Sequence, residues 1–213
     1  MDKVIPLHAP LPPLFLVGPM GSGKSTFAEF LVTRHGYHRL AFGSYVRRVI
    51  AAVMPELAQE PKAVQRAWLQ KVGDGMRAAD RNFWVNLLRQ DVLRLPSQTP
   101  WVVEDCRRLN EWYALRDLGG LPVILECPTP IRRQRIVARD GVWMEEWSGH
   151  DSELEARDLA DRPPTQAVVL TTEALPEVDG QPVLREWDQV LRSILQQWQW
   201  MEERDDDEDG EEY

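Results

Sequence analysis

Cysteine is scarce in this chain, because its 213 residues include only Cys106 and Cys127. Their spacing matches neither a disulfide framework nor a cysteine-ligated metal site, which excludes disulfide-stapled domains and zinc modules. Both cysteines lie near the ends of predicted strands, where a reduced thiol behaves as a small buried hydrophobe. We therefore expect free, buried thiols and a cytoplasmic protein.

Long apolar runs are also missing. No segment approaches the roughly 20 consecutive apolar residues that a helix needs to cross a bilayer, so we expect no membrane contact. The opening segment, MDKVIPLHAPLPP, lacks the apolar core of a signal peptide. We interpret it as a proline-rich approach to the first strand.

Basic residues are not in excess. The net charge is −9, and residues 201–213 contain nine acidic residues and one arginine, which leaves residues 1–200 with a net charge of −1. No basic stripe offsets nucleic-acid phosphates, so a long nucleic acid is not expected as the main ligand. The acidic tail has almost nothing to bury and is expected to be disordered. Its default role is solubility, and partner binding is the alternative.

The sequence does contain a glycine-rich joint between an apolar strand and a helix, LFLVGPMGSGKSTFAEFLV at 14–32. The spacing Gly18-x-x-x-x-Gly23-Lys24-Ser25 matches the phosphate-binding loop G-x-x-x-x-G-K-[ST]. Glycines let successive backbone N–H groups point at one anion, and the following helix dipole adds to the attraction. We expect Lys24 to reach the outer phosphates of a nucleoside triphosphate and the Ser25 hydroxyl to ligate Mg²⁺. The predicted nucleotide-binding residues are Gly21, Ser22, Gly23, Lys24, Ser25 and Thr26.

Strands alternate with helices along the chain, which predicts an α/β fold: a P-loop three-layer sandwich with a central parallel sheet. Expected strands cover 14–17, 38–41, 99–105, 121–127 and 167–170, and expected helices cover 25–34, 43–54, 62–79, 83–95, 108–118, 130–139 and 184–200. We interpret residues 1–200 as one domain with acceptor-binding helices at about 43–97, a lid at about 130–155, and the tail 201–213 outside it.

Two acidic residues, Glu104 and Asp105, end a buried strand at the edge of the sheet where ligands of open α/β folds bind. A carboxylate there can hold Mg²⁺ beside the phosphate loop, and we assign this role to Asp105. Side chains alternate along a strand, so Glu104 should point the other way. Arg107 and Arg108 follow directly and could contact a phosphate of a second substrate.

Arginines gather in two further segments. PTPIRRQRIVARDG carries Arg132, Arg133, Arg135 and Arg139, whose planar groups suit a transferring phosphoryl group, and the irregular segment after them suggests a lid. Farther upstream, a monophosphate acceptor and its nucleoside could be held by Arg47, Arg66, Arg77, Asp74, Asp80 and Trp84. Periodicity alone assigns Trp84, and also Trp68, to the core.

Several motifs together resemble one family. GPMGSGKST, LAFGSYVRRVI, QKVGDGMRAADRNFW, VVEDCRRLNE and GHDSE occur in the order found in bacteriophage-type deoxynucleoside monophosphate kinases, a branch of the P-loop nucleoside monophosphate kinases. The resemblance spans roughly residues 14–175. Its more discriminating elements are D-x-R-x-x-N-E, formed by Asp105, Arg107, Asn110 and Glu111, and H-x-S-E, formed by His150, Ser152 and Glu153.

The resemblance implies transfer of the ATP γ-phosphoryl group to a deoxynucleoside 5′-monophosphate, with ATP and Mg²⁺ as cofactors, in the host cytoplasm if a phage encodes the chain. It implies catalytic roles for Lys24, Asp105, Arg107, Arg135 and Arg139, and metal contacts for Ser25 and Asp105. The acceptor-binding set that we predict is Phe42, Arg47, Arg66, Gln70, Asp74, Arg77, Asp80, Trp84, Arg107, Glu111, His150, Ser152 and Glu153.

The chain departs from the family pattern at Glu104, where relatives often have a small residue, and at Arg108, where an aromatic residue is expected. Two tryptophans, Trp143 and Trp147, fall in the predicted lid. Alternative interpretations are a small-molecule kinase of the dephospho-coenzyme A or phosphomevalonate type, and a nucleotide-gated interaction protein. The sequence leaves open the accepted base, the preference for deoxyribose, and whether the molecule forms a homodimer.

Overall fold

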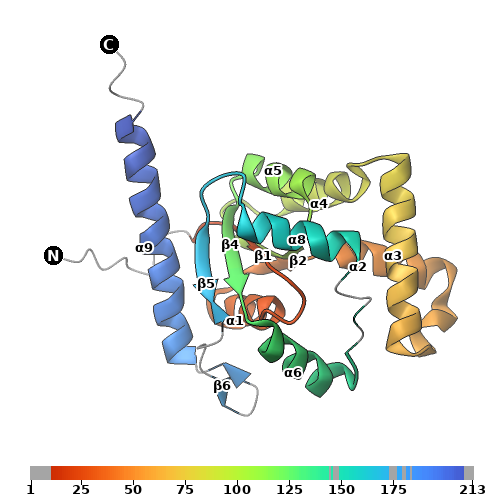
Figure 1. Cartoon of the computed structure of the whole chain (residues 1–213). Coiled ribbons are helices and arrows are strands. Elements are labelled where there is room, and N and C mark those ends of the chain that lie inside the picture. The colour runs from red at the N-terminus through yellow and green to blue at the C-terminus, as the bar shows by residue number, and fades with distance from the viewer. Residues whose placement is uncertain are drawn as a thin grey trace.

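The computed structural model describes residues 11–143, 145, 149–172, 177–178, 181–182 and 184–208, without the side chains at 62–63, 177–186 and 200–208 (Figure 1). Its centre is a five-stranded sheet in the order β2-β3-β1-β4-β5, in which every neighbouring pair is parallel. The strands are β1 Leu14–Val17, β2 His38–Leu40, β3 Trp101–Cys106, β4 Leu121–Glu126 and β5 Val168–Thr171. A parallel sheet flanked by helices confirms the predicted fold class.

The helices connect these strands and cover both faces of the sheet (Figure 1). They are α1 Lys24–His35, α2 Phe42–Val53, α3 Lys62–Ala79, α4 Phe83–Arg94, α5 Leu109–Asp117, α6 Thr129–Asp140, α8 Asp151–Asp161 and α9 Leu184–Glu208, with a short 3₁₀ helix, η1, at Pro55–Gln59. The predicted elements agree with these bounds within two residues, except at the end of α9. The sequence did not predict η1, α8, or the small hairpin of β6 Glu177–Val178 and β7 Gln181–Pro182.

Buried side chains alternate between the two faces of the central strand β1. Leu14 and Leu16 pack into a core with α1 and α9, whereas Phe15 and Val17 pack into a second core with α2, α4 and α5. All four side chains are fully buried, as expected for a parallel strand covered on both sides. Phe15 meets Trp112 edge-on, with ring centroids 5.1 Å apart. Apolar packing on both faces therefore holds the sheet in place.

The C-terminal region differs from the prediction. Helix α9 continues to Glu208, so the backbone at 201–208 is helical where we expected a disordered tail from 201. Methionine, glutamate and arginine, the residue types at 201–204, are good helix formers, so this stretch can continue the backbone hydrogen bonds of α9. Residues 209–213 of the predicted tail, and 144 and 146–148 of the predicted lid, lie outside the described residues.

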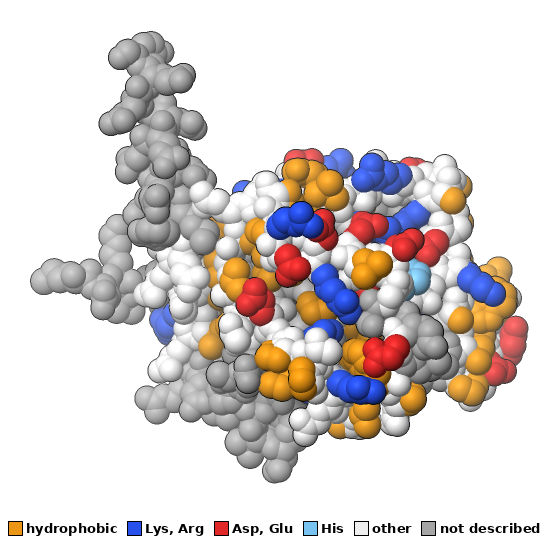
Figure 2. Space-filling model, viewed as in Figure 1, with side chains coloured by type: hydrophobic (Ala, Val, Ile, Leu, Met, Phe, Trp, Pro, Cys, Tyr) orange, Lys and Arg blue, Asp and Glu red, His pale blue; other side chains and the backbone are white. Residues whose placement is uncertain are grey.

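Membrane-spanning character is absent from the described helices, since none of them is both long and apolar enough to cross a bilayer. The visible described surface mixes basic, acidic and apolar side chains closely (Figure 2).

In the sheet, the carboxyl ends of β1, β3 and β4 meet at one edge, because neighbouring strands are parallel. The phosphate-binding loop follows β1 at this edge, Arg107 follows β3, and α6 follows β4.

Candidate active site

The glycine-rich loop between β1 and α1 needs glycine for steric reasons. Gly18, Gly21 and Gly23 have positive φ values of 143°, 81° and 93°. A Cβ atom on Gly18 would lie 2.5 Å from the carbonyl oxygen of Leu125, and one on Gly21 would lie 2.9 Å from that of Arg132. The loop therefore sits directly on the end of β4 and the first turns of α6, a close approach that a side chain at either glycine would prevent.

The lysine of the loop is buried. Lys24 is 7% exposed, and its Nζ donates hydrogen bonds to the carbonyl oxygens of Gly18 at 2.7 Å and Pro19 at 2.8 Å. Burial, and secondarily the charge of Arg107, lower the pKa of Lys24 to about 8. A phosphate bound in the loop would favour the charged form. In this structure the ammonium group bonds carbonyl oxygens of its own loop, and its contact with phosphate stays a prediction from the loop motif.

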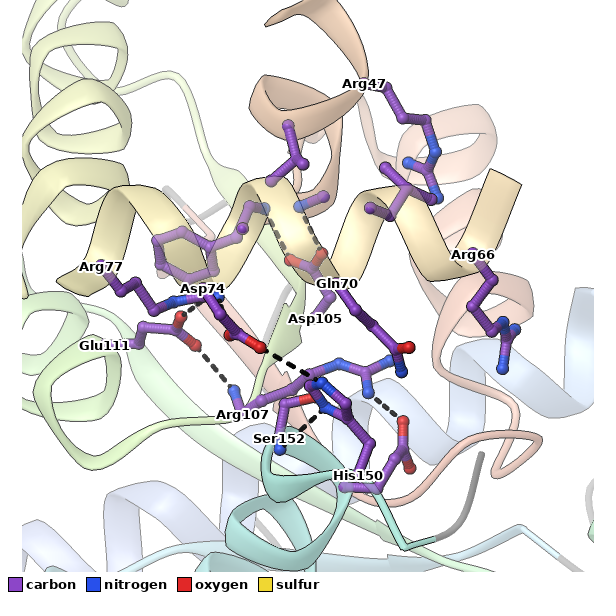
Figure 3. Close-up of a pocket in the computed structure, with 16 residues that line it drawn as sticks. Arg47, Arg66, Gln70, Asp74, Arg77, Asp105, Arg107, Glu111, His150 and Ser152 are labelled. Atoms are coloured by element: carbon purple, nitrogen blue, oxygen red, sulfur yellow. Dashed lines mark hydrogen bonds and ion pairs between the residues drawn. The ribbon is translucent and has the colours of Figure 1, made fainter. Parts of the chain in front are cut away.

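A pocket opens beside the loop, between the end of β3 and helices α2, α3 and α8 (Figure 3). It is a cavity of about 180 Å³. The structure brings together eleven of the thirteen predicted acceptor-binding residues around it, and we call it the acceptor pocket. Those eleven are Phe42, Arg47, Arg66, Gln70, Asp74, Arg77, Arg107, Glu111, His150, Ser152 and Glu153.

An ion pair connects the acceptor pocket to the phosphate loop. Glu153, 4% exposed at the start of α8, pairs with the guanidinium of Arg107 and also accepts a hydrogen bond from the Met20 N–H at 2.9 Å. Burial alone would raise the pKa of Glu153, but the charges of Arg107 and Lys24 outweigh that effect and lower it. Glu153 is therefore ionised at neutral pH and holds Arg107 against the loop.

Asp105 anchors the start of α2. Its two carboxylate oxygens accept hydrogen bonds from the backbone N–H groups of Phe42 at 2.7 Å and Gly43 at 2.8 Å. Burial raises the pKa of Asp105 above its ordinary value, although the Gly43 N–H and the Arg107 charge oppose this. The side chain of the preceding residue, Glu104, points away from that of Asp105 and pairs with Arg39 at 2.6 Å, as the alternation of side chains along a strand predicted.

The donors near the loop fit a Mg²⁺ ion that arrives with a nucleotide. Among the described residues, no group of three or more His, Cys, Asp or Glu side chains could hold a metal ion alone. Mg²⁺ needs few protein ligands when phosphate oxygens and water complete its octahedron. The two predicted ligands offer oxygen atoms of the kind Mg²⁺ prefers: the exposed Ser25 hydroxyl at the start of α1, and Asp105, whose oxygens keep further lone pairs.

Several carboxylates offset part of the positive charge in the acceptor pocket. Arg77 lies 3.1 Å from Asp74 and 3.7 Å from Glu111, and His150 lies 3.3 Å from the other oxygen of Asp74. Burial raises the pKa of Glu111 to about 7, and the Arg107 N–H and the Arg77 charge limit the rise. Arg77 is thus already engaged by two acidic side chains.

Arg47 and Arg66 reach the same side of the acceptor pocket as the end of Arg107 (Figure 3). Arg47 is exposed on α2, and no hydrogen bond or ion pair joins it to another described residue. The Nη1 of Arg66, on α3, lies 2.6 Å from the Met20 Sδ, and burial lowers the Arg66 pKa. Three guanidinium groups from three segments therefore surround one part of the pocket, an arrangement suited to an anion.

Two predicted acceptor-binding residues lie outside the pocket, which corrects the prediction. Trp84 is 1% exposed in the core, and its Nε1 donates a hydrogen bond to the Gly73 carbonyl at 2.9 Å. Asp80 instead accepts a hydrogen bond from Asn82 N–H at the start of α4. Trp84 therefore supports α3, which forms the pocket wall, from behind, whereas Asp80 is exposed. Trp68, which periodicity assigned to the core, is 36% exposed with Lys71 over its ring.

The arginines of α6 have three different environments. Arg132 is 5% exposed and donates hydrogen bonds to the carbonyl oxygens of Met20 and Cys127, so it braces the loop. The Arg135 guanidinium donates to the Thr172 carbonyl at 3.0 Å and lies close to Gly23 of the loop. Arg139 is exposed, pairs with its neighbour Asp140, and does not line the acceptor pocket.

Sequence reasoning missed four residues that line the acceptor pocket: Gly43, Val46, Leu69 and Gly73. A Cβ on Gly43 would lie 3.2 Å from the Asp105 carboxylate, and one on Gly73 would lie 3.1 Å from the Arg77 guanidinium. A glycine inside a helix costs about 1 kcal/mol relative to alanine. A glycine within a predicted helix therefore indicates that another group lies close to the backbone there. Gly43 in α2 and Gly73 in α3 carried this signal in the sequence.

Comparisons with known proteins show a family and a fold. A family model described as an AAA domain (AAA_18) matches residues 14–162. No curated protein matches the chain. The solved structure of TT1252 from Thermus thermophilus is 21% identical, with a TM-score of 0.56, and the match covers 88% of this chain and 98% of that one.

Two kinases are also similar. A gluconokinase from Sinorhizobium meliloti is 22% identical with a TM-score of 0.49, covering 88% of this chain and 93% of that one. A shikimate kinase from Acinetobacter baumannii in complex with shikimate is 20% identical with a TM-score of 0.46, covering 88% and 94%. At such identities a structural likeness shows only a shared fold, here the α/β P-loop fold found in TT1252. The family model covers most of the chain, and the chain belongs to the AAA domain family AAA_18.

Proposed function

We propose that the protein is an ATP-dependent kinase that phosphorylates a deoxynucleoside or nucleoside 5′-monophosphate. The observation that carries this proposal is the convergence of Arg47, Arg66 and Arg107 in a pocket directly joined to the phosphate loop through Glu153. A kinase of this class needs two anion sites in line, one for the triphosphate and one for the acceptor phosphate. The motif resemblance supplies the nucleotide class of the acceptor.

The chain's own residues would act mainly by positioning and by charge. In phosphoryl transfer, most catalysis comes from alignment and from stabilising charge on the equatorial oxygens. Loop amides and Lys24 would bind the donor phosphates, while Arg47 and Arg66 bind the acceptor phosphate and Arg107 faces both. Arg135, beside Gly23, would meet the donor nucleotide at the loop. Mg²⁺, held by Ser25 and Asp105, would neutralise donor phosphate charge when bound.

A panel of acceptors tests the proposal most directly. Purified protein with ATP and Mg²⁺ would be assayed for ADP formation with each common deoxynucleoside and nucleoside monophosphate. Dephospho-coenzyme A, phosphomevalonate, gluconate and shikimate complete the panel. We expect rapid turnover with one or more of the monophosphates. Turnover confined to a non-nucleotide acceptor would refute the nucleotide class, and slow hydrolysis that no acceptor stimulates would favour a nucleotide-gated interaction protein.

Adjacent arginines on α2 provide a matched pair of variants. Arg47→Gln removes a pocket cation, whereas Arg48→Gln removes an exposed cation that lies over the Tyr45 ring outside the pocket. We expect Arg47→Gln to raise the acceptor KM at least about tenfold, since a hydrogen bond to a charged group is lost. Arg48→Gln should leave it unchanged. Equal KM values for both variants would place the acceptor phosphate elsewhere.

Two observations favour a second candidate, phosphorylation of a hydroxyl on a small polar acid. Asp74 and Glu111 already balance Arg77, and the cavity of about 180 Å³ lies below the 300 Å³ or so that is typical of ligand pockets. A compact polyol acid would use these carboxylates as hydrogen-bond acceptors. The gluconate and shikimate arms of the panel test this candidate directly.

A further inference from the structure

A second cavity, of about 390 Å³, lies beside the start of the phosphate loop and shares no lining residue with the acceptor pocket. Pro19 of the loop, the ends of β4 and β5, the beginning of α6 and the last turns of α8 enclose it. None of the catalytic roles proposed above uses this cavity. We call it the rear cavity.

An arginine with an unsatisfied donor lines the rear cavity. The Nε of Arg157, on α8, is buried and makes no hydrogen bond within the part of the chain that the structure describes. Asp161 lies one helical turn further along, yet no ion pair joins it to Arg157, whereas Asp158 and Arg162 on the same helix do form one. A buried N–H donor that makes no hydrogen bond costs free energy. A ligand that supplies an acceptor to this donor would remove that cost.

A second cation lies close to Arg157. Arg132 also lines the rear cavity, and its hydrogen bonds go to the Met20 and Cys127 carbonyls and to the Thr129 hydroxyl. Burial lowers the pKa of Arg132, and the charge of Arg157 lowers it further. Both arginines line the same cavity, so their like charges repel each other across it. An anion between them would relieve this repulsion.

The remaining lining residues indicate which anion fits. Pro19, Leu125 and Ala160 offer apolar surface, while Glu126 and Asp161 are exposed acidic residues. Those two carboxylates would repel a dianion such as a phosphate monoester. A single uncommitted guanidinium matches one carboxylate, which it can bind through two parallel hydrogen bonds. The ligand expected is thus a monocarboxylate with an uncharged, partly apolar body.

We propose that the rear cavity binds the carboxylate of a small organic acid, with Arg157 as its main partner and Arg132 as a second positive neighbour. An acid bound there contacts Pro19, whose carbonyl oxygen accepts the hydrogen bond from Lys24. It therefore touches the same loop that holds the nucleotide phosphates. The site is independent of which acceptor the enzyme phosphorylates.

Calorimetric titration of the full chain with benzoate tests the site, with benzamide as an uncharged probe of the same shape. Saturating ADP keeps the phosphate loop filled during the titration. We expect benzoate to bind and benzamide to bind at least about tenfold more weakly, because only the carboxylate pairs with a guanidinium. Arg157→Gln should weaken benzoate binding by a similar factor, and the exposed Arg162→Gln control should not.

The proposal fails if benzoate does not bind, or if benzamide binds as tightly. It also fails if a folded Arg157→Gln variant binds benzoate like the unaltered chain. Benzoate that binds only when ADP is left out would occupy the phosphate loop instead, and this result would overturn the proposal as well. The comparison of the two probes uses only the unaltered chain, so it decides the question even if the variant does not fold.

Discussion

The ion pair between Glu153 and Arg107 makes a quantitative prediction about stability. One oxygen of Glu153 pairs with Arg107 and the other accepts the Met20 N–H, and the Glu153 side chain is only 6% exposed. Glu153→Gln keeps the shape and an acceptor for Met20, but removes the charge that compensates Arg107. Arg107 then remains between the loop and the acceptor pocket without its carboxylate.

The expected loss follows from this geometry. Removing one partner of a buried ion pair costs about 3–5 kcal/mol. The retained amide restores roughly 1 kcal/mol through a neutral hydrogen bond, and the Arg107 side chain is 30% exposed, so water screens part of its charge. We therefore expect Glu153→Gln to lower the free energy of unfolding by about 2–3 kcal/mol at neutral pH.

The pH dependence has a definite sign. Burial alone would raise the pKa of Glu153, but Arg107 and Lys24 lower it below the ordinary value in the folded protein. The stabilisation from the ionised carboxylate is therefore complete above the unfolded pKa, about 4.3, and is lost as the pH falls through the folded pKa. The difference between the unaltered chain and Glu153→Gln should shrink in acid for that reason.

Urea unfolding at several pH values between neutral and acid measures both effects. Glu155→Gln on the same helix is the control, because Glu155 is 44% exposed and its partner Arg108 keeps a second carboxylate, that of Asp74. We expect that control to lose at most about 1 kcal/mol. The reasoning is refuted if Glu153→Gln loses no more than Glu155→Gln at neutral pH, or if its loss stays constant in acid.

Three further predictions concern the loop and its support. Lys24→Ala should abolish turnover in the phosphotransfer assay, because the loop loses the charge that faces the donor phosphates; turnover at the unaltered rate would refute the assigned role. Because the pKa of Lys24 is about 8, nucleotide affinity should fall as the pH rises above 8, by up to about tenfold per unit, and ADP titrations that stay flat with pH would contradict this. Trp84→Phe should cost about 1 kcal/mol of stability through the lost hydrogen bond to Gly73, with a larger acceptor KM as the wall of α3 loosens; an unchanged melting temperature would argue against that support role.

The sequence by itself determined the phosphate loop and the order of strands and helices. Both are local signals, because a strand, a tight turn and a helix dipole involve neighbouring residues only. The spacing from Gly18 to Ser25 therefore identified the loop before any tertiary contact was known. The alternation of strands and helices in turn identified a parallel sheet and the edge at which the site lies.

Charged groups were found from sequence more reliably than their partners were. The arginines at 47, 66, 77 and 107 all line one pocket, as their residue type suggested. Arg132 has the same residue type, yet it is buried and braces the loop, while Arg139 faces solvent. Periodicity cannot separate these environments, since helix spacing tells which residues share a face but not what that face meets.

Only the tertiary structure decided which residues from distant segments contact one another in the site. Asp105 from β3 anchors the first turn of α2, and Glu153 from α8 joins Arg107 to the loop, over separations of 62 and 46 residues. Trp84 supports the pocket from behind instead of lining it. These contacts depend on how helices pack across the sheet. That packing is set by the whole core, which no local stretch of sequence describes.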